Sequence, residues 1–131
     1  MPRAVVDAAY TEKHDLRSCP GGFVLLRRMT YGEFLDRRAM VSKMSISGDK
    51  NNKKEFAGEL ALVNRKVTEL EFAKCIVDHN LEDEMGNKLN LSQAFSMDKL
   101  DPRIGEEISE LIDKMNQFES IINEEGDEGN S

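Results

Sequence analysis

The fold is decided largely by one segment, CPGGFVLLRRMTYGEFLDRRAMVSKM, which occupies residues 19–44. Its first four residues are typical of a turn, because proline fixes one dihedral angle and glycine tolerates positive φ. Residues 23–26 form a short apolar run that predicts a strand. Thr30 and Glu33 have the spacing of a capping box, in which each side chain satisfies a free backbone N–H of the first helical turn. The segment therefore predicts a turn, a strand and a helix that begins at Tyr31.

Helical spacing continues through this segment and returns twice further along the chain. The first helix is expected over residues 31–45, and its imperfect apolar stripe is compatible with one buried face. Residues 54–78 repeat apolar side chains at alternating intervals of four and three, which predicts a long core helix. A short helix is expected over residues 92–100. The two stripes consist of Phe34, Leu35, Met40, Val41 and Met44 in the first helix, and of Phe56, Leu60, Val63, Val67 and Leu70 in the second.

The last helix has the clearest start. Asp101 suits the N-cap position, and Pro102 suits the first helical position. Its apolar residues then follow helical spacing, with carboxylates on the opposite face: Ile104, Ile108, Leu111, Ile112, Met115, Phe118 and Ile122. Gly32 and Gly105 fall in the first turns of helices, where glycine either costs little or marks a close contact. These patterns predict a strongly amphipathic C-terminal helix.

The remaining segments complete a mainly α fold, a small bundle of about four helices with a short N-terminal β-strand or two-stranded ribbon. Residues 1–18 lack periodicity and are expected to be a loose N-terminal arm. Residues 45–54 predict a polar loop and residues 85–88 a turn. Residues 88–91 are expected to pair with residues 23–26 as a second strand. One helical domain would then span residues 19–122, followed by a disordered acidic tail over residues 123–131.

Composition places the chain among small intracellular proteins. A length of 131 residues fits one domain with one modest core. Seven methionines and no tryptophan suggest a helical core that flexible side chains fill. Two cysteines, together with the lack of a signal peptide or a long apolar run, favour a reducing cytosolic setting and argue against membrane insertion.

Charge is distributed unevenly. Residues 21–54 hold eight Lys or Arg and three Asp or Glu, a net charge of +5, whereas residues 101–131 hold two and ten, a net charge of −8. The two regions either attract each other within the fold or present a basic face to an acidic partner. The overall net charge of −7 and the lack of interleaved aromatic residues argue against nucleic-acid binding.

The four residues that suit zinc fall in two pairs. They are His14 with Cys19, and Cys75 with His79. Cys75 and His79 are four residues apart and would share one helical face, so the four side chains are compatible with a tetrahedral structural zinc site. The alternative is that Cys75 is a small core residue, that His79 caps a helix C-terminus and that Cys19 has no role.

No catalytic motif is present. The chain lacks the phosphate-binding, dinucleotide-binding, nucleophile-elbow and zinc-protease patterns. Cys75 and His79 together lack the orienting group and the oxyanion hole that a thiolate nucleophile needs. We therefore expect no enzyme and no cofactor, apart from the possible zinc. A thiol-dependent enzyme is the weakest interpretation, and it would require a reactive Cys75 with a depressed pKa.

The segment of residues 19–44, together with CIVDHNL at residues 75–81 and LDPRIGEEI at residues 100–108, resembles the small tail assembly chaperones of long-tailed, siphovirus-type bacteriophages. The resemblance covers most of residues 19–122. It implies a protein that acts in the host cytoplasm, coats the aggregation-prone tape measure protein, helps recruit tail tube subunits and is absent from the mature virion. It also implies that the acidic tail is a plausible linker to a frameshifted extension.

The residues expected to bind such partners lie in the basic helix and in the last amphipathic helix, because helix-in-groove packing needs exposed apolar stripes. Self-association is expected for the same reason. The main alternative function is a small zinc-stabilised regulator that binds nucleic acid through its arginines. The candidate partner-binding residues are Arg27, Arg28, Tyr31, Phe34, Arg37, Met40, Met44, Ile104, Ile108, Leu111, Met115 and Phe118.

Overall fold

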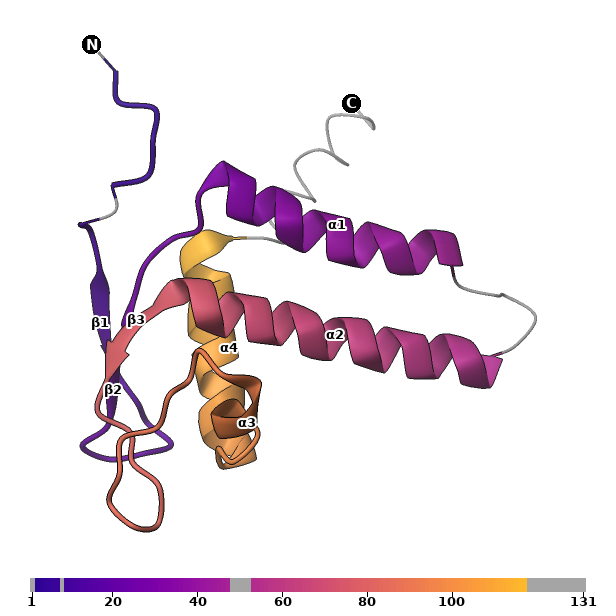
Figure 1. Ribbon diagram of the computed structural model, residues 1–131. Coiled ribbons are helices and arrows are strands. Elements are labelled where there is room, and N and C mark those ends of the chain that lie inside the picture. The colour runs from indigo at the N-terminus through magenta and orange to yellow at the C-terminus, as the bar shows by residue number, and fades with distance from the viewer. Residues whose placement is uncertain (1, 8, 48–52, 118–131) are drawn as a thin grey trace.

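A computed structural model describes residues 2–7, 9–47 and 53–117 (Figure 1). Its sheet has three antiparallel strands in the order β1-β2-β3. They are β1 (Glu12–Asp15), β2 (Phe23–Leu26) and β3 (Ile76–His79). The expected strand at residues 23–26 is thus confirmed, and it is the central strand. The mainly α bundle is wrong, however, because the chain has an α+β fold in which a full sheet forms part of the core.

Two strands account for this correction. β1 lies within residues 1–18, which were expected to be an irregular arm, and it pairs with β2 so that His14 is opposite Val24. β3 occupies residues assigned to the long helix, and it pairs with β2 so that His79 is opposite Val24. The expected pairing of residues 88–91 with β2 is wrong, since β3 takes that position and Lys88 forms only an isolated bridge with Glu82.

The turn before β2 has the predicted chemistry. The Gly22 N–H donates to the Cys19 carbonyl (2.8 Å), and the Leu16 N–H donates to the Gly22 carbonyl (2.9 Å). Gly21 has a φ of +85°. A Cβ at Gly22 would lie 3.0 Å from the Cys19 carbonyl oxygen. Both glycines are therefore required by the close return of the chain from β1 to β2.

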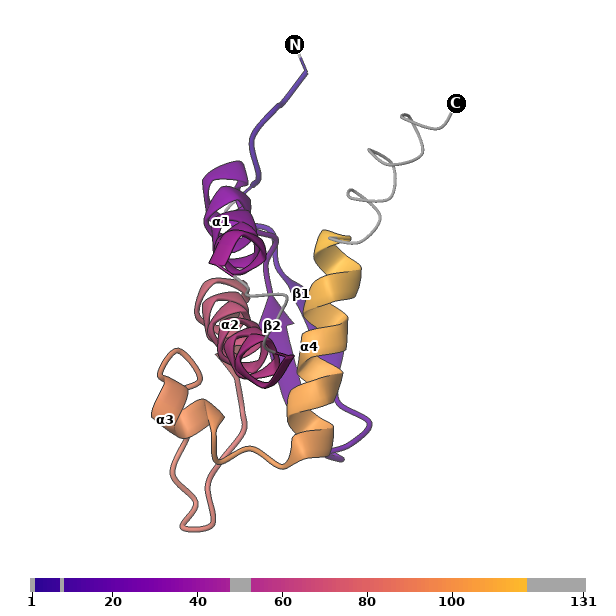
Figure 2. The ribbon, with the colours of Figure 1, turned by 90° about the vertical axis from the view of Figure 1, so that its right-hand side faces the viewer.

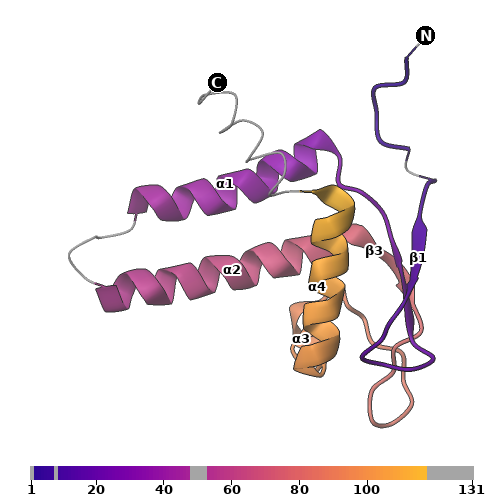
Figure 3. The ribbon, with the colours of Figure 1, turned by 180° about the vertical axis from the view of Figure 1, so that it is seen from behind.

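The four helices are α1 (Tyr31–Ser47), α2 (Lys53–Cys75), α3 (Ala94–Met97) and α4 (Pro102–Asn116). α1 and α2 run side by side as an antiparallel pair, and α4 crosses α2 close to the point where α2 continues into β3 (Figures 1 and 3). Seen along the pair, α1 lies over α2 and α4 stands beside them next to the sheet (Figure 2). The far end of the α1–α2 pair extends beyond both α4 and the sheet.

The starts of α1 and α4 agree with the sequence, whereas α3 covers only residues 94–97 of the expected 92–100. The ends of α2 and α4 differ from those expected. α1 begins at Tyr31 as predicted, and the Asp101 side chain caps α4 by accepting from the Arg103 N–H, with Pro102 in the first turn. α2 stops at Cys75, three residues before the expected end. α4 stops at Asn116, so Phe118 and Ile122 of its expected stripe lie outside the described residues.

The core lies between the sheet, α4 and the C-terminal part of α2. Phe72 and Cys75 of α2 meet Val24 and Leu26 of β2 and the apolar side of α4. Its buried apolar members are Leu16, Val24, Leu26, Met29, Phe72, Cys75, Leu81, Leu91, Ile108 and Ile112. Within the described ranges, none of the helices combines the length and the apolar character that a membrane crossing requires.

Candidate partner-docking surface

α1 starts at a capping box that is extended by an ion pair. The Glu33 N–H donates to Thr30 Oγ1 (3.3 Å), and the Thr30 N–H donates to the Glu33 carboxylate (3.0 Å). Arg27 Nη1 and Nη2 donate to the two oxygens of the same carboxylate at 3.0 and 2.8 Å. The Arg27 guanidinium is the main cause that lowers the Glu33 pKa to about 2, and Thr30 adds to it against the effect of burial. The capping box is confirmed, and Glu33 is ionised at any physiological pH.

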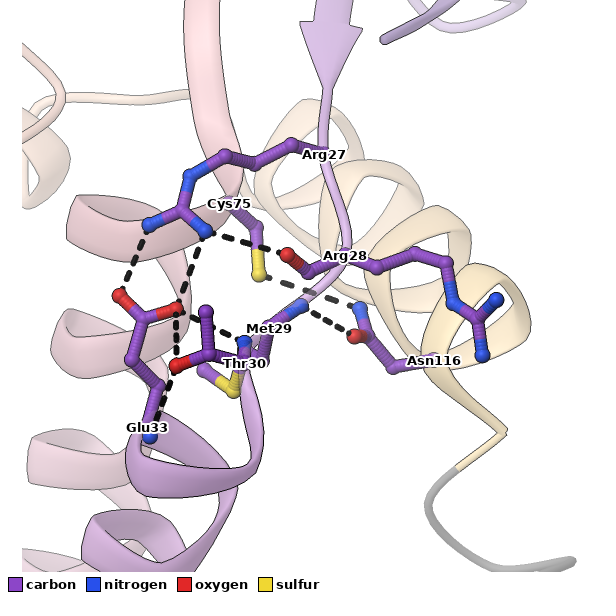
Figure 4. A network of polar contacts seen from close by, with 7 residues as sticks. All are labelled: Arg27, Arg28, Met29, Thr30, Glu33, Cys75 and Asn116. Carbon is purple, nitrogen blue, oxygen red and sulfur yellow. Dashed lines mark hydrogen bonds and ion pairs between the residues drawn. The ribbon is translucent and has the colours of Figure 1, made fainter. Parts of the chain in front are cut away.

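A second set of contacts joins this helix start to the two neighbouring helices (Figure 4). Asn116, in the last turn of α4, accepts from the Met29 N–H through Oδ1 at 2.8 Å. Its Nδ2 donates to the Ile112 carbonyl (2.9 Å) and to Cys75 Sγ (3.8 Å). The Arg27 N–H donates to the Cys75 carbonyl (2.9 Å). These bonds fix the first turn of α1 against the ends of α2 and α4.

Arg37 holds the next turn of α1 against α2. Its Nε donates to the Glu71 carboxylate at 2.8 Å. Burial raises the Glu71 pKa, and the Arg37 guanidinium opposes that rise. The side chains of Arg37 and Glu71 are only 20% and 9% exposed, so the pair is largely shielded from water. It orients α1 by defining the side that faces α2.

The outer side of α1 carries a stripe of aromatic and apolar residues, called here the outer stripe. Successive intervals of three or four residues along a helix place side chains on one face. Tyr31 is 70% exposed, and Leu35 and Val41 are each 40% exposed. The outer stripe consists of Tyr31, Phe34, Leu35, Arg38 and Val41. From Tyr31 to Val41 it extends for about 15 Å.

Two ring contacts order the N-terminal half of the outer stripe. The rings of Tyr31 and Phe34 stack with their centroids 6.4 Å apart. The Arg38 guanidinium lies over the Phe34 ring, 5.0 Å from its centroid. Phe34 itself packs partly against the core. The outer stripe therefore presents aromatic area with a cation near its centre, on a helix whose base is fixed by hydrogen bonds.

The structure distributes the predicted partner-binding residues over several environments. Arg27 and Arg37 form ion pairs within the fold, whereas Arg28 is exposed. Ile108 is fully buried in the core and is not available to a partner. Met40 is half-buried, and Ile104, Leu111 and Met115 are half-buried against the core. The Met44 side chain and Phe118 lie outside the part of the chain that is described.

Two members of the outer stripe, Leu35 and Val41, were assigned to a buried face by the sequence analysis. That interpretation is wrong, because both side chains are substantially exposed. The available signal was the spacing of three and four from Tyr31, which runs through Phe34, Arg38 and Val41. This spacing identifies an exposed face only when the side of the helix that faces α2 is known.

The four potential zinc ligands occupy different parts of the fold. α2 ends at Cys75 and His79 belongs to β3, so the expected shared helical face does not exist. His14 and His79 flank Val24 from opposite sides, and Cys19 lies in the turn. No group of three or more His, Cys, Asp or Glu side chains suited to a metal ion occurs among the residues that the structure describes.

Cys75 and His79 are integrated into the core instead. Cys75 is fully buried, and burial raises the pKa of its thiol to about 12. A nucleophilic cysteine requires the opposite shift. The Leu81 N–H donates to His79 Nδ1 at 3.0 Å, and burial lowers the pKa of the imidazole. The pair therefore has the properties of packing residues.

Comparisons of the chain with protein-family models, with curated proteins and with solved structures found no match. A function is therefore inferred from the outer stripe and from the resemblance of residues 19–44, 75–81 and 100–108 to tail assembly chaperones.

Proposed function

We propose that this protein is a tail assembly chaperone of a long-tailed bacteriophage, which binds helical segments of the tape measure protein in the host cytoplasm and keeps them soluble until tail tube subunits assemble. The sequence resemblance supplies the class of partner. The exposed outer stripe of α1 is the observation that carries the proposal. The function is non-enzymatic and leaves the protein outside the finished virion.

The physical task of such a chaperone is to cover apolar helix stripes. Tyr31, Leu35 and Val41 offer apolar area at the spacing with which a second helix interdigitates. Aromatic residues and arginine dominate the energetics of protein interfaces. The Arg27–Glu33 pair and Asn116 hold the start of α1 in place, so little conformational entropy would be lost on docking.

The outer stripe also favours one kind of helix. Arg38 lies near its centre, over the Phe34 ring. A partner helix with an apolar stripe would bury Leu35 and Val41. We therefore expect the bound segments of the tape measure protein to be amphipathic helices.

Self-association is proposed as well, through a surface other than the outer stripe. Two copies that met symmetrically along α1 would bring Arg38 close to Arg38 of the second copy, because an isologous contact places central residues opposite themselves. Such a pair of cations is unfavourable. Sedimentation at high concentration tests this, and a strictly monomeric profile would contradict self-association.

Co-expression tests the proposal. The partner is the longest coiled-coil protein encoded in the same genome, and its soluble yield is compared with and without this chain. A higher soluble yield with co-purification of both chains is expected. A partner that stays insoluble and never co-purifies would contradict the chaperone assignment.

Two variants in the same co-purification experiment test whether the partner binds to the outer stripe. Leu35→Glu is expected to abolish co-purification, because it places a charge in the apolar stripe. Val77→Glu is the matched control, since Val77 is 50% exposed on β3, away from α1. Equal loss in both variants would contradict the assignment to α1.

A further inference from the structure

A groove lies between β1 and α4, which run in opposite directions (Figures 1 and 3). Two adjoining hollows of about 530 and 630 Å³ make up this groove. His14, Leu111 and Lys114 line both hollows, so the two are continuous. The groove therefore has one end nearer the start of α4 and another end at its last turn.

The end nearer the start of α4 is acidic. Asp15 and Glu110 are exposed there, and Asp113 is half-buried. Glu107 also lines this end, and its carboxylate accepts from the Arg17 N–H at 2.9 Å, so it is used within the fold. The Arg17 side chain is exposed in the same hollow. Four carboxylates outnumber the cations that line this hollow, which gives it a net negative charge.

The end at the last turn of α4 is basic. Arg28 and Lys114 are exposed in its lining, and Arg28 extends beside the final turn of α4 (Figure 4). Glu12 lines this hollow as well. Its carboxylate accepts from the Tyr10 hydroxyl at 3.0 Å and lies 3.3 Å from His14 Nε2. The two cations are thus exposed, whereas the carboxylate beside them is engaged within the fold.

We propose that a second copy of this chain docks on this groove about a two-fold axis that passes near Leu111. The inference rests on the self-association proposed above and assigns a surface to it. A two-fold axis places a residue near the axis opposite the same residue of the second copy. Leu111 then meets Leu111 of the second copy. Asp15 and Glu110 face Arg28 and Lys114 of the second copy, and the same contact occurs a second time on the other side of the axis.

Charge complementarity favours a second copy over an unrelated partner, because the groove carries both signs of charge. A uniformly acidic partner would meet like charge at one end, and a uniformly basic partner would meet it at the other. A second copy turned by the two-fold axis meets opposite charge at both ends. Leu111 and Met115, which are half-buried, add apolar area between the two ends.

Charge reversal with complementation tests this interface in the full chain. Arg28→Glu with Lys114→Glu makes both ends of the groove acidic, and Asp15→Lys with Glu110→Lys makes both ends basic. Sedimentation measures the dissociation constant of the dimer. For each double variant alone it is expected to rise by at least about tenfold, because like charges meet at both contacts. An equimolar mixture of the two double variants is expected to form dimers as the wild type does, since opposite charges meet again.

Two further measurements complete the test. Lys66→Glu is the matched control, since Lys66 is exposed on α2 and does not line the groove, and it should leave the dissociation constant unchanged. In the wild type, which carries no substitution, the dissociation constant should rise with sodium chloride concentration, because salt screens exposed charges. A dissociation constant that does not respond to salt would overturn the proposal.

Other outcomes would also overturn it. They are a monomeric wild type at high concentration, unchanged association of both double variants with native circular dichroism, and a mixture of the two natively folded variants that stays monomeric. Species larger than a dimer would contradict the two-fold contact, which closes after two copies. None of these samples contains the tape measure protein, and the groove and the outer stripe have no described residue in common. Failure here is therefore distinguishable from failure of the chaperone proposal, which the co-expression experiment decides.

Discussion

Glu33 and Asn116 lie where α1 meets the rest of the molecule, and each uses several hydrogen-bonding atoms there. Glu33 accepts from Arg27 and Thr30, and Asn116 bonds to Met29, Ile112 and Cys75. Among the described residues, every buried side-chain nitrogen and oxygen has a hydrogen-bond partner. Removing one member leaves others unsatisfied at a cost of about 1–3 kcal/mol. Stability is therefore sensitive to single polar residues at this junction.

Acid should destabilise the protein through Glu33. Its pKa is about 2 in the folded chain, below the value of about 4.3 in an unfolded chain. A lowered folded-state pKa contributes stability that is complete above the unfolded value and is lost as the pH falls toward 2. Urea denaturation measures the free energy of unfolding at each pH. Between pH 5 and pH 2 this free energy should fall in both proteins, and the fall in Glu33→Gln should be smaller than in the wild type by on the order of 2–3 kcal/mol. Parallel pH dependences of the two proteins would contradict this.

Two glycines should respond in opposite directions to alanine. In Gly22→Ala the new Cβ would lie 3.0 Å from the Cys19 carbonyl oxygen, so we expect a loss of about 1–3 kcal/mol of unfolding free energy. At Gly105 the corresponding Cβ meets nothing within 4 Å, so Gly105→Ala should stabilise α4 by up to about 1 kcal/mol. Thermal unfolding of both variants measures the difference. Equal melting temperatures would exclude the close contact at Gly22.

The two cysteines should differ in reactivity. Cys75 is fully buried with a pKa of about 12, whereas Cys19 is partly exposed in the turn. A thiol reagent under native conditions should modify Cys19 first and Cys75 only after unfolding, because the thiolate is the reactive form. In Cys19→Ser the native protein should react only slowly. Rapid native modification of Cys75 would contradict its place in the core.

For α1 and α4, the sequence predicts where the helix begins better than where it ends. The capping box at Thr30 and the Asp101-Pro102 pair are local signals, and both helices begin where those signals lie. The change from α2 to β3 has no such signal, because residues 76–79 contain neither glycine nor proline. Residues 76–79 leave the helix because they pair with β2, and this pairing is a long-range contact.

β1 could not be recognised for a related reason. Its residues are Glu, Lys, His and Asp, which show no alternation of apolar and polar side chains. Charged residues are common on edge strands, where they discourage further pairing. Only the tight return through Gly21 and Gly22 brings this segment beside β2. The sequence therefore predicts only the central strand of the sheet and neither of its two edge strands.

The contact between α1 and α2 should depend on one ion pair. Arg37→Met would leave the Glu71 carboxylate buried without its cation, and we expect a cost of about 3–5 kcal/mol. Glu71→Gln in the Arg37→Met background should recover part of that loss. Chemical denaturation of both single variants and the double variant measures the coupling. Strictly additive losses would show that the pair does not hold the two helices together.

α1 and α2 form a pair of helices that reaches beyond a small α+β body (Figure 1). The body fixes one end of the pair through Arg27, Glu33 and Asn116. This arrangement leaves the outer stripe accessible on a helix whose orientation is already set. Preorganised helix surfaces of this kind bind other helices with a small entropic cost.

The proposed docking surface includes some of the residues that the sequence predicts to bind partners. Tyr31 and Phe34 belong to it and follow from the position of the helix start. Leu35 and Val41 were placed on a buried face, because one imperfect stripe does not reveal which side meets a neighbouring helix. That side is set by the bond from Arg37 to Glu71, which joins residues 34 positions apart. No pattern within α1 contains this information.

The most direct test of partner docking on α1 is the affinity of the purified protein for a soluble helical fragment of the tape measure protein. The wild type, Leu35→Glu and the control Val77→Glu are measured side by side. We expect Leu35→Glu to weaken binding by at least about tenfold, or about 1.4 kcal/mol, with Val77→Glu close to the wild type. Unchanged affinity in Leu35→Glu, or an equal loss in Val77→Glu, would contradict the outer stripe as the docking surface.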